Sequence, residues 1–206
     1  MIRDPQDLPR YTAAERANHW VVGICFILLA LSGLAFFHPA FFPLAQIFGG
    51  GVWARILHPF IGVVMALSFL ALFLRFRALN AMTPADREWL GRIREMVDGD
   101  DHNMPEQGKY NGGQKALFWA LSLCVLLLTL SGIAIWRAYF GFDIGLVRLG
   151  AVVHAATAAV MIALIMVHVY AAIWVKGTLR AMWYGSVTRG WARQHHRGWY
   201  RQITGK

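Results

Sequence analysis

Residues 149–175 read LGAVVHAATAAVMIALIMVHVYAAIWV and contain no Asp, Glu, Lys or Arg. A helix needs about 20 mostly apolar residues to cross the hydrocarbon layer of a bilayer. The stretch is long enough for this, and it carries His154 and His168 within otherwise apolar sequence. We therefore predict a membrane-spanning helix that holds two imidazoles at different depths.

Three further stretches have the same apolar, charge-free character, at residues 19–37, 56–74 and 116–136. Between the first two, Pro39, Pro43 and three consecutive glycines at 49–51 predict an apolar loop. The sequence thus predicts an all-α integral membrane protein. Its architecture is a four-transmembrane-helix bundle, formed by one domain over residues 1–206, with a loop at 75–115 and a tail at 176–206.

Composition and charge place this bundle in a lipid bilayer. The chain is 57% hydrophobic and 15% charged, yet its formal net charge is +9. A soluble domain of this size cannot bury so much apolar surface. The N-terminal tail, the loop 75–115 and the tail 176–206 hold 17 of the 20 Lys and Arg residues. The positive-inside rule then predicts that both termini are cytoplasmic, so the basic charge indicates orientation and not nucleic-acid binding.

Two segments outside the spans have an amphipathic pattern. Thr83-Pro84 predicts a helix cap and a first helical residue. The apolar residues that follow at helical spacing are Trp89, Leu90, Ile93, Met96 and Val97. They predict a short helix on the membrane surface or against another protein. A weaker pattern near the C-terminus indicates a second such helix or a solvated tail; its residues are Met182, Trp183, Val187 and Trp191.

Four of the eight histidines lie in or at the edge of a span: His19, His58, His154 and His168. Ionisable residues in membrane segments are costly and default to a functional role, although a single histidine is as often an ordinary hydrogen-bonded residue. With cytoplasmic termini, His19 and His168 share the cytoplasmic depth, and the other two share the outer depth. Along one helix, His154 and His168 are separated by about 21 Å and face the same side.

Two histidines from two helices at each depth suit bis-imidazole ligation of haem in a helical bundle. A zinc site would need three or four converging ligands, and a proton relay would usually place Asp or Glu in the spans. No C-x-x-C-H motif for covalent haem attachment occurs. Arg16 and Arg55 each precede one of these histidines by three residues. They share its helix face and are candidates to pair with haem propionates, or they are simple membrane anchors.

A weak internal repeat relates the first and third spans. Residues 29–35 read LALSGLA, and residues 128–134 read LTLSGIA. Two helix hairpins related by an axis along the membrane normal would produce such a repeat, and the Ser-Gly pairs would let helices approach closely. Apolar sequences also match one another by chance, so both interpretations stay open.

Several motifs resemble the cytochrome b (gamma) subunit of membrane-bound respiratory formate dehydrogenase, a di-haem family. They are ANHW at 17–20, ILHPF at 56–60, GKYNGGQK at 108–115, VHAA at 153–156, VHVYAAIWVKG at 167–177 and RQHHRGWYR at 193–201. The resemblance runs nearly from end to end. Its most specific element is the GKYNGGQK loop.

The resemblance implies two haem b groups in the bacterial inner membrane. By the matching motifs, His58 and His154 would hold the periplasmic haem, and His19 and His168 the cytoplasmic one. A quinone, either ubiquinone or menaquinone, would bind beside the cytoplasmic haem. The residues implied for that site are Asn111, Gly113, Gln114 and His168.

The resemblance also implies the partners. An iron–sulfur beta subunit would deliver electrons from a catalytic alpha subunit, and the whole would assemble as a trimer of heterotrimers. No formate-oxidising site is expected in this chain. Two alternatives stay open: the same relay serving an uptake hydrogenase or another molybdoenzyme, and a haem-free membrane anchor or transporter bundle.

Overall fold

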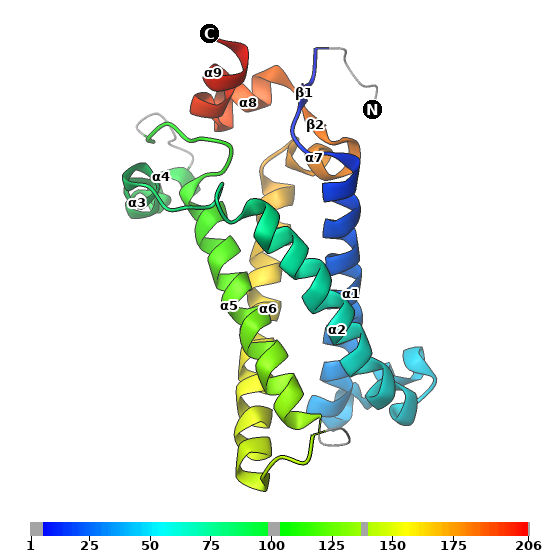
Figure 1. Ribbon diagram of the computed structural model, residues 1–206. Coiled ribbons are helices and arrows are strands. Elements are labelled where there is room, and N and C mark those ends of the chain that lie inside the picture. Colours follow the sequence, from blue (N-terminus) through cyan, green and yellow to red (C-terminus); the bar gives the residue numbers. More distant parts are fainter. Residues whose placement is uncertain (1–5, 99–103, 137–139, 206) are drawn as a thin grey trace. The chain divides into compact units, whose positions relative to one another are not determined.

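Four long helices dominate the computed structural model, which describes residues 6–98, 104–136 and 140–205 (Figure 1). They are α1 (Ala13–Phe37), α2 (Gly51–Phe76), α5 (Gly112–Ile135) and α6 (Ile144–Trp174). All four are long and apolar enough to cross a membrane. The prediction of four spans in an all-helical membrane protein is confirmed; His102 and Arg137 lie outside the described residues.

Each long helix begins four to six residues before its predicted span. In α1 the reason is a cap: the Thr12 hydroxyl accepts the N–H of Glu15 at 3.2 Å, and the Glu15 carboxylate accepts the N–H of Thr12 at 2.9 Å. Such reciprocal capping satisfies two backbone N–H groups at a helix start. Charge-free intervals mark only the apolar part of a helix, so they miss a polar first turn of this kind.

The chain divides into two compact units, which are described separately. Residues 17–74 and 121–167 form the first, here called the helical unit. Its buried core draws on all four long helices: Cys25, Met65, Cys124, Val125 and Met161. Large apolar side chains on the same helices are exposed, among them Leu67, Leu123 and Val152. This distribution is expected where the outward faces of helices meet lipid and not water.

The segment that joins α1 to α2 is ordered. It forms a 3₁₀ helix, η1 (Pro39–Phe48), instead of the predicted loop. The His38 side chain accepts the N–H of Ala40, and Gly49 ends the helix with a φ of 88°. Since proline at the first position and a left-handed glycine at the end both delimit helices, Pro39 and Gly49 mark its ends, whereas Pro43 lies inside it.

Residues 1–16, 75–120 and 168–206 form the second unit, here called the terminal unit. In it the strand β1 (Leu8–Pro9) pairs antiparallel with β2 (Ser186–Val187). The helices of the tail are α7 (Thr178–Tyr184), α8 (Arg189–His195) and α9 (Arg197–Thr204). Their core is Leu8, Ala181, Val187, Trp191, Ala192 and Trp199. The interpretation of the tail therefore needs correction in part: Met182 and Trp183 lie on α7, with Trp183 exposed, but Val187 and Trp191 are buried in this core and lie neither on a free helix face nor in a solvated tail.

Two short helices follow α2 in the same unit, α3 (Pro84–Gly91) and α4 (Ile93–Val97). Thr83 caps α3 and Pro84 is its first residue, as the sequence predicts. The structure adds Asp86, which forms a capping box with Thr83. Trp89 is buried, whereas Ile93 is exposed. The apolar face of this segment is thus turned in part toward the protein itself, because Trp89 packs within the unit.

Candidate functional site

His58 on α2 and His154 on α6 lie opposite one another in the helical unit. Their ring centroids are 6.1 Å apart, and the ring planes make an angle of 61°. Two imidazoles bound to opposite sides of one metal ion, each with a metal–nitrogen bond of about 2 Å, also have centroids roughly 6 Å apart. The spacing of this pair therefore fits a shared metal ion.

A pair of histidines is fewer ligands than a metal ion held by side chains alone usually has. Among the described residues, no group of three or more His, Cys, Asp or Glu side chains could hold a metal ion. A haem supplies four nitrogens of its own and takes only axial ligands from the protein. A facing pair of histidines is the donor set that such a group requires.

Each of the two rings also contacts a serine on the preceding long helix. Oγ of Ser32 lies 2.7 Å from Nδ1 of His58. Oγ of Ser131 lies 3.0 Å from Nδ1 of His154. Sequence reasoning found both serines, but only as members of the repeat and as points of close helix approach. Their common position in the repeat was the signal that could have linked them to the histidines.

The second histidine pair is divided between the two units. His19 belongs to the helical unit and stands edge-on to Trp20, with ring centroids 5.9 Å apart. His168 belongs to the terminal unit and lies on α6, which runs without interruption from Ile144 to Trp174. The pairing of these two histidines stays a prediction.

The two candidate propionate partners have other contacts within their own units. Arg16 donates to the backbone carbonyl of Tyr11 at 3.1 Å. The guanidinium of Arg55 lies 6.0 Å from the centroid of the Phe36 ring. Their role toward a haem also stays a prediction.

The predicted quinone residues form the start of α5. The Asn111 side-chain oxygen accepts the N–H of Gln114 at 2.9 Å, and the Gln114 side-chain oxygen accepts the N–H of Asn111 at 3.1 Å. The two side chains thus cap the helix for each other, as in a capping box. Gln114 uses its oxygen in this cap, which leaves the amide NH₂ groups of the two residues as hydrogen-bond donors.

The adjacent glycines are required by packing. A Cβ atom at Gly112 would lie 2.5 Å from the carbonyl oxygen of Asp86, and one at Gly113 would lie 2.9 Å from two ring carbons of Trp89. Any side chain at these positions would clash with α3. The glycine pair therefore lets α3 approach the first turn of α5, whatever else it does.

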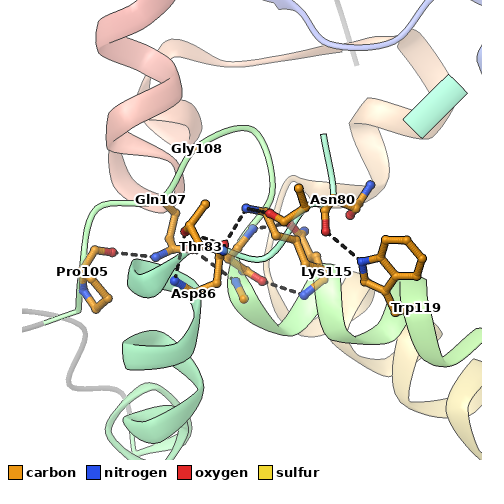
Figure 2. A network of polar contacts seen from close by, with 12 residues as sticks. Asn80, Thr83, Asp86, Pro105, Gln107, Gly108, Lys115 and Trp119 are labelled. Carbon is orange, nitrogen blue, oxygen red and sulfur yellow. Dashed lines mark hydrogen bonds and ion pairs between the residues drawn. The ribbon is translucent and has the colours of Figure 1, made fainter. Parts of the chain in front are cut away.

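A polar network fixes the same region (Figure 2). Lys115 donates to Oδ2 of Asp86 at 2.7 Å and to the carbonyl of Ala81 at 3.1 Å. Thr83 donates to the same carboxylate through its hydroxyl and its N–H. Burial raises the pKa of Asp86, but the bonds from Lys115 and Thr83 outweigh it and hold this pKa below its ordinary value. Asp86 is therefore an ionised, fully bonded anchor.

A second buried cluster joins the loop before α5 to both ends of the chain. Arg10 lies between the rings of Trp191 and Trp199, 4.9 and 4.8 Å from their centroids. It approaches Nε2 of His196, whose Nδ1 donates to the Gly108 carbonyl at 2.8 Å. Burial and the Arg10 charge lower the pKa of His196 to about 3, so this imidazole is neutral. Nothing in the sequence pairs residues 10 and 196.

Comparisons with known proteins show which proteins this chain resembles. A family model described as prokaryotic cytochrome b561 matches residues 10–185. The chain is 47% identical to the formate dehydrogenase cytochrome b556(fdo) subunit of Escherichia coli, over 94% of this chain and 92% of that subunit. It is 42% identical to the nitrate-inducible cytochrome b556(Fdn) subunit of the same organism, over 92% and 88%. It is 40% identical to a formate dehydrogenase cytochrome b556 subunit of Haemophilus influenzae, over 94% and 82%.

Proposed function

The chain belongs to the prokaryotic cytochrome b561 family, and on that premise we propose that it is the di-haem cytochrome b subunit of a formate dehydrogenase. It is a multi-pass bacterial membrane protein with the electron-transfer role of a b-type cytochrome. Relatives that cover most of its length are formate dehydrogenase cytochrome b556 subunits, which supports the assignment to that complex.

The observation that carries the proposal is the facing pair of His58 and His154. Their centroid separation of 6.1 Å fits two histidines that would hold one haem between them. His19 and His168 are the proposed ligands of a second haem, with Arg16 and Arg55 as proposed partners of the propionates. Haem b, when bound, supplies the one-electron redox chemistry that lets the subunit pass electrons from a partner to a quinone.

The charge distribution supports the proposed orientation in the membrane, and the cysteines support the proposed division of labour between subunits. The two tails and the loop 75–115 hold 17 of the 20 basic residues, so this side is assigned to the cytoplasm. His58 and His154 then lie in the outer half of the membrane. Both cysteines, Cys25 and Cys124, are buried in the helical unit. Since iron–sulfur clusters are held by cysteine thiolates, the clusters that feed electrons to this chain belong to a beta subunit, and formate oxidation to an alpha subunit.

The proposed quinone site consists of Asn111, Gly113 and Gln114 at the start of α5 and His168 on α6. All four residues belong to the terminal unit. The Asn111 oxygen is engaged by the cap, so its amide NH₂ is the group that would donate to a quinone carbonyl. Gly113 would contribute its backbone to the site, because the Trp89 ring fills the space that a side chain would occupy. The assembly into a trimer of such complexes is also part of the proposal.

Purification of the intact complex through a tag on this chain tests the function. Co-purification of an iron–sulfur subunit and a formate-oxidising subunit is expected, and formate should produce a b-type difference spectrum. Haem reduction by hydrogen with no response to formate would assign the chain to a hydrogenase instead. A complex with no b-type absorption would show that the chain is a haem-free membrane protein, such as an anchor.

A further inference from the structure

We infer that Ser32 and Ser131 are positioning residues for the His58–His154 site. Each serine accepts the Nδ1 hydrogen of one histidine and so presents the Nε2 of that ring to the iron. The inference rests on the proposed haem site and goes beyond it, because it assigns a role to residues that bind no metal themselves.

The direction of each hydrogen bond follows from a second contact of the serine. Oγ of Ser32 lies 2.8 Å from the Leu28 carbonyl oxygen. Oγ of Ser131 lies 2.6 Å from the Leu127 carbonyl oxygen. A carbonyl can only accept, and a hydroxyl has a single hydrogen, so each serine donates to its own helix. The same oxygen must then accept from the imidazole, and Nδ1 carries the hydrogen.

This assignment fixes the tautomer of both histidines. A neutral imidazole that donates from Nδ1 has its lone pair on Nε2, the nitrogen that can bind a metal. A hydrogen bond at the other nitrogen also sets the orientation of the ring and raises the basicity of the ligand. At many metal sites a carboxylate or a backbone carbonyl has this role. Here a serine has this role, joined at His154 by a hydrogen bond to the backbone of Leu128, and neither contact buries a charge in the membrane.

The arrangement occurs twice, at the same positions of the internal repeat. Ser32 and Ser131 occupy the fourth position of LALSGLA and LTLSGIA. The glycine that follows each serine lies against the same ring. A Cβ atom at Gly33 would lie 3.6 Å from Cε1 of His58. One at Gly132 would lie 3.5 Å from Cε1 of His154. Because two separate contacts recur in both halves, the repeat is a duplicated support for a histidine and not chance similarity.

A neighbouring residue supplies the matched control. The Thr129 hydroxyl on α5 donates to the Val125 carbonyl at 2.7 Å, the same bond that Ser131 makes to its own helix. Thr129→Val removes a helix-bonded hydroxyl two residues from Ser131. A general effect of losing such a hydroxyl on α5 would therefore appear in Thr129→Val as well.

The decisive comparison is Ser131→Thr against Ser131→Val in the intact complex. The two side chains have the same shape, and only threonine keeps the hydroxyl. The readouts are the haem content and the midpoint potential of each haem, both measured by visible absorption spectroscopy. Because a less basic ligand favours the ferric form less, Ser131→Val should raise the potential of the His58–His154 haem or weaken haem binding 10–100-fold. A tenfold change in the ferric–ferrous equilibrium corresponds to about 59 mV. Haem content and potential should keep wild-type values in Ser131→Thr and in Thr129→Val. The potential of the second haem should stay unchanged in every variant.

Equal potentials and equal haem content in Ser131→Thr and Ser131→Val would overturn the inference, as would the same shift in Thr129→Val. Ser32→Thr and Ser32→Val repeat the comparison at His58, so poor assembly at one position does not remove the test. A wild-type complex without haem at this site contradicts the proposed function. Haem that is present but unaffected by either serine contradicts only the present inference.

Discussion

Nζ of Lys115 lies 2.7 Å from Oδ2 of Asp86, and both side chains are largely buried. The contact joins the first turn of α5 to α3 in the terminal unit. It gives the last residue of the GKYNGGQK motif a structural role, because a buried lysine needs a partner for its charge. Much of the GKYNGGQK motif, which carries the resemblance to the family, therefore has a structural role: it holds the loop before α5 in place.

Removing the cation should destabilise the terminal unit. In Lys115→Met, Asp86 is left buried without its main partner, and breaking a buried ion pair in this way costs about 3–5 kcal/mol. Arg201→Met removes the exposed pair with Glu106, at a cost of about 1 kcal/mol or less. Limited proteolysis of the loop 75–115 compares the two variants. Equal resistance would show that the buried pair does not hold the loop.

Acid should destabilise the same unit through His196. Its pKa lies at about 3 instead of 6.5, because burial and then the charges of Arg10 and His195 disfavour the imidazolium. The unfolded chain takes up this proton below pH 6.5 and the folded chain does not. The contribution of His196 to stability is therefore full above pH 6.5 and falls toward pH 3, by roughly 1 kcal/mol per pH unit.

The neutral variant His196→Asn keeps a donor for the Gly108 carbonyl and should lose this part of the pH dependence. Thermal denaturation or proteolysis of the complex at pH 7, 6 and 5 measures both proteins. The same pH slope in wild type and variant would assign the acid sensitivity to other groups.

Gly113 and Trp89 should be coupled. In Gly113→Ala the new Cβ atom meets the Trp89 ring at 2.9 Å, so the variant should be destabilised by about 1–3 kcal/mol. In a Trp89→Leu background the ring is gone, and the same alanine should cost much less. A double-mutant cycle on thermal stability measures the difference. Equal costs in the two backgrounds would mean that the glycine is needed for another reason.

Asn111→Asp should separate capping from quinone binding. Asparagine and aspartate cap helices about equally well, so the variant should keep the stability of α5. It loses the amide NH₂ and, if that group holds the quinone carbonyl, the KM for quinone should rise at least tenfold. Quinone-dependent reoxidation of the reduced complex gives the KM. An unchanged KM would remove Asn111 from the quinone site.

Much of the fold could be predicted because lipid imposes simple rules on sequence. Charge-free stretches locate the four spans. The distribution of basic residues gives the orientation of each span, and the orientation shows which histidines share a depth. His58 and His154 could be paired in this way before any contact was known. Depth alone does not say which helix faces which, so it does not assign their serines; the common position of Ser32 and Ser131 in the repeat is the available signal. Contacts such as Arg10 with His196 also escape prediction, since they join residues 186 positions apart through a fold that periodicity does not specify.

The haem-to-protein ratio of the purified complex measures how many haems this chain holds. We expect two b haems per copy of the chain in the wild type and one in His154→Ala, because the other histidine pair keeps its own haem. His58→Ala should give the same result. Fewer than two haems in the wild type, or two in His154→Ala, would show that the four histidines do not hold two haems in these pairs.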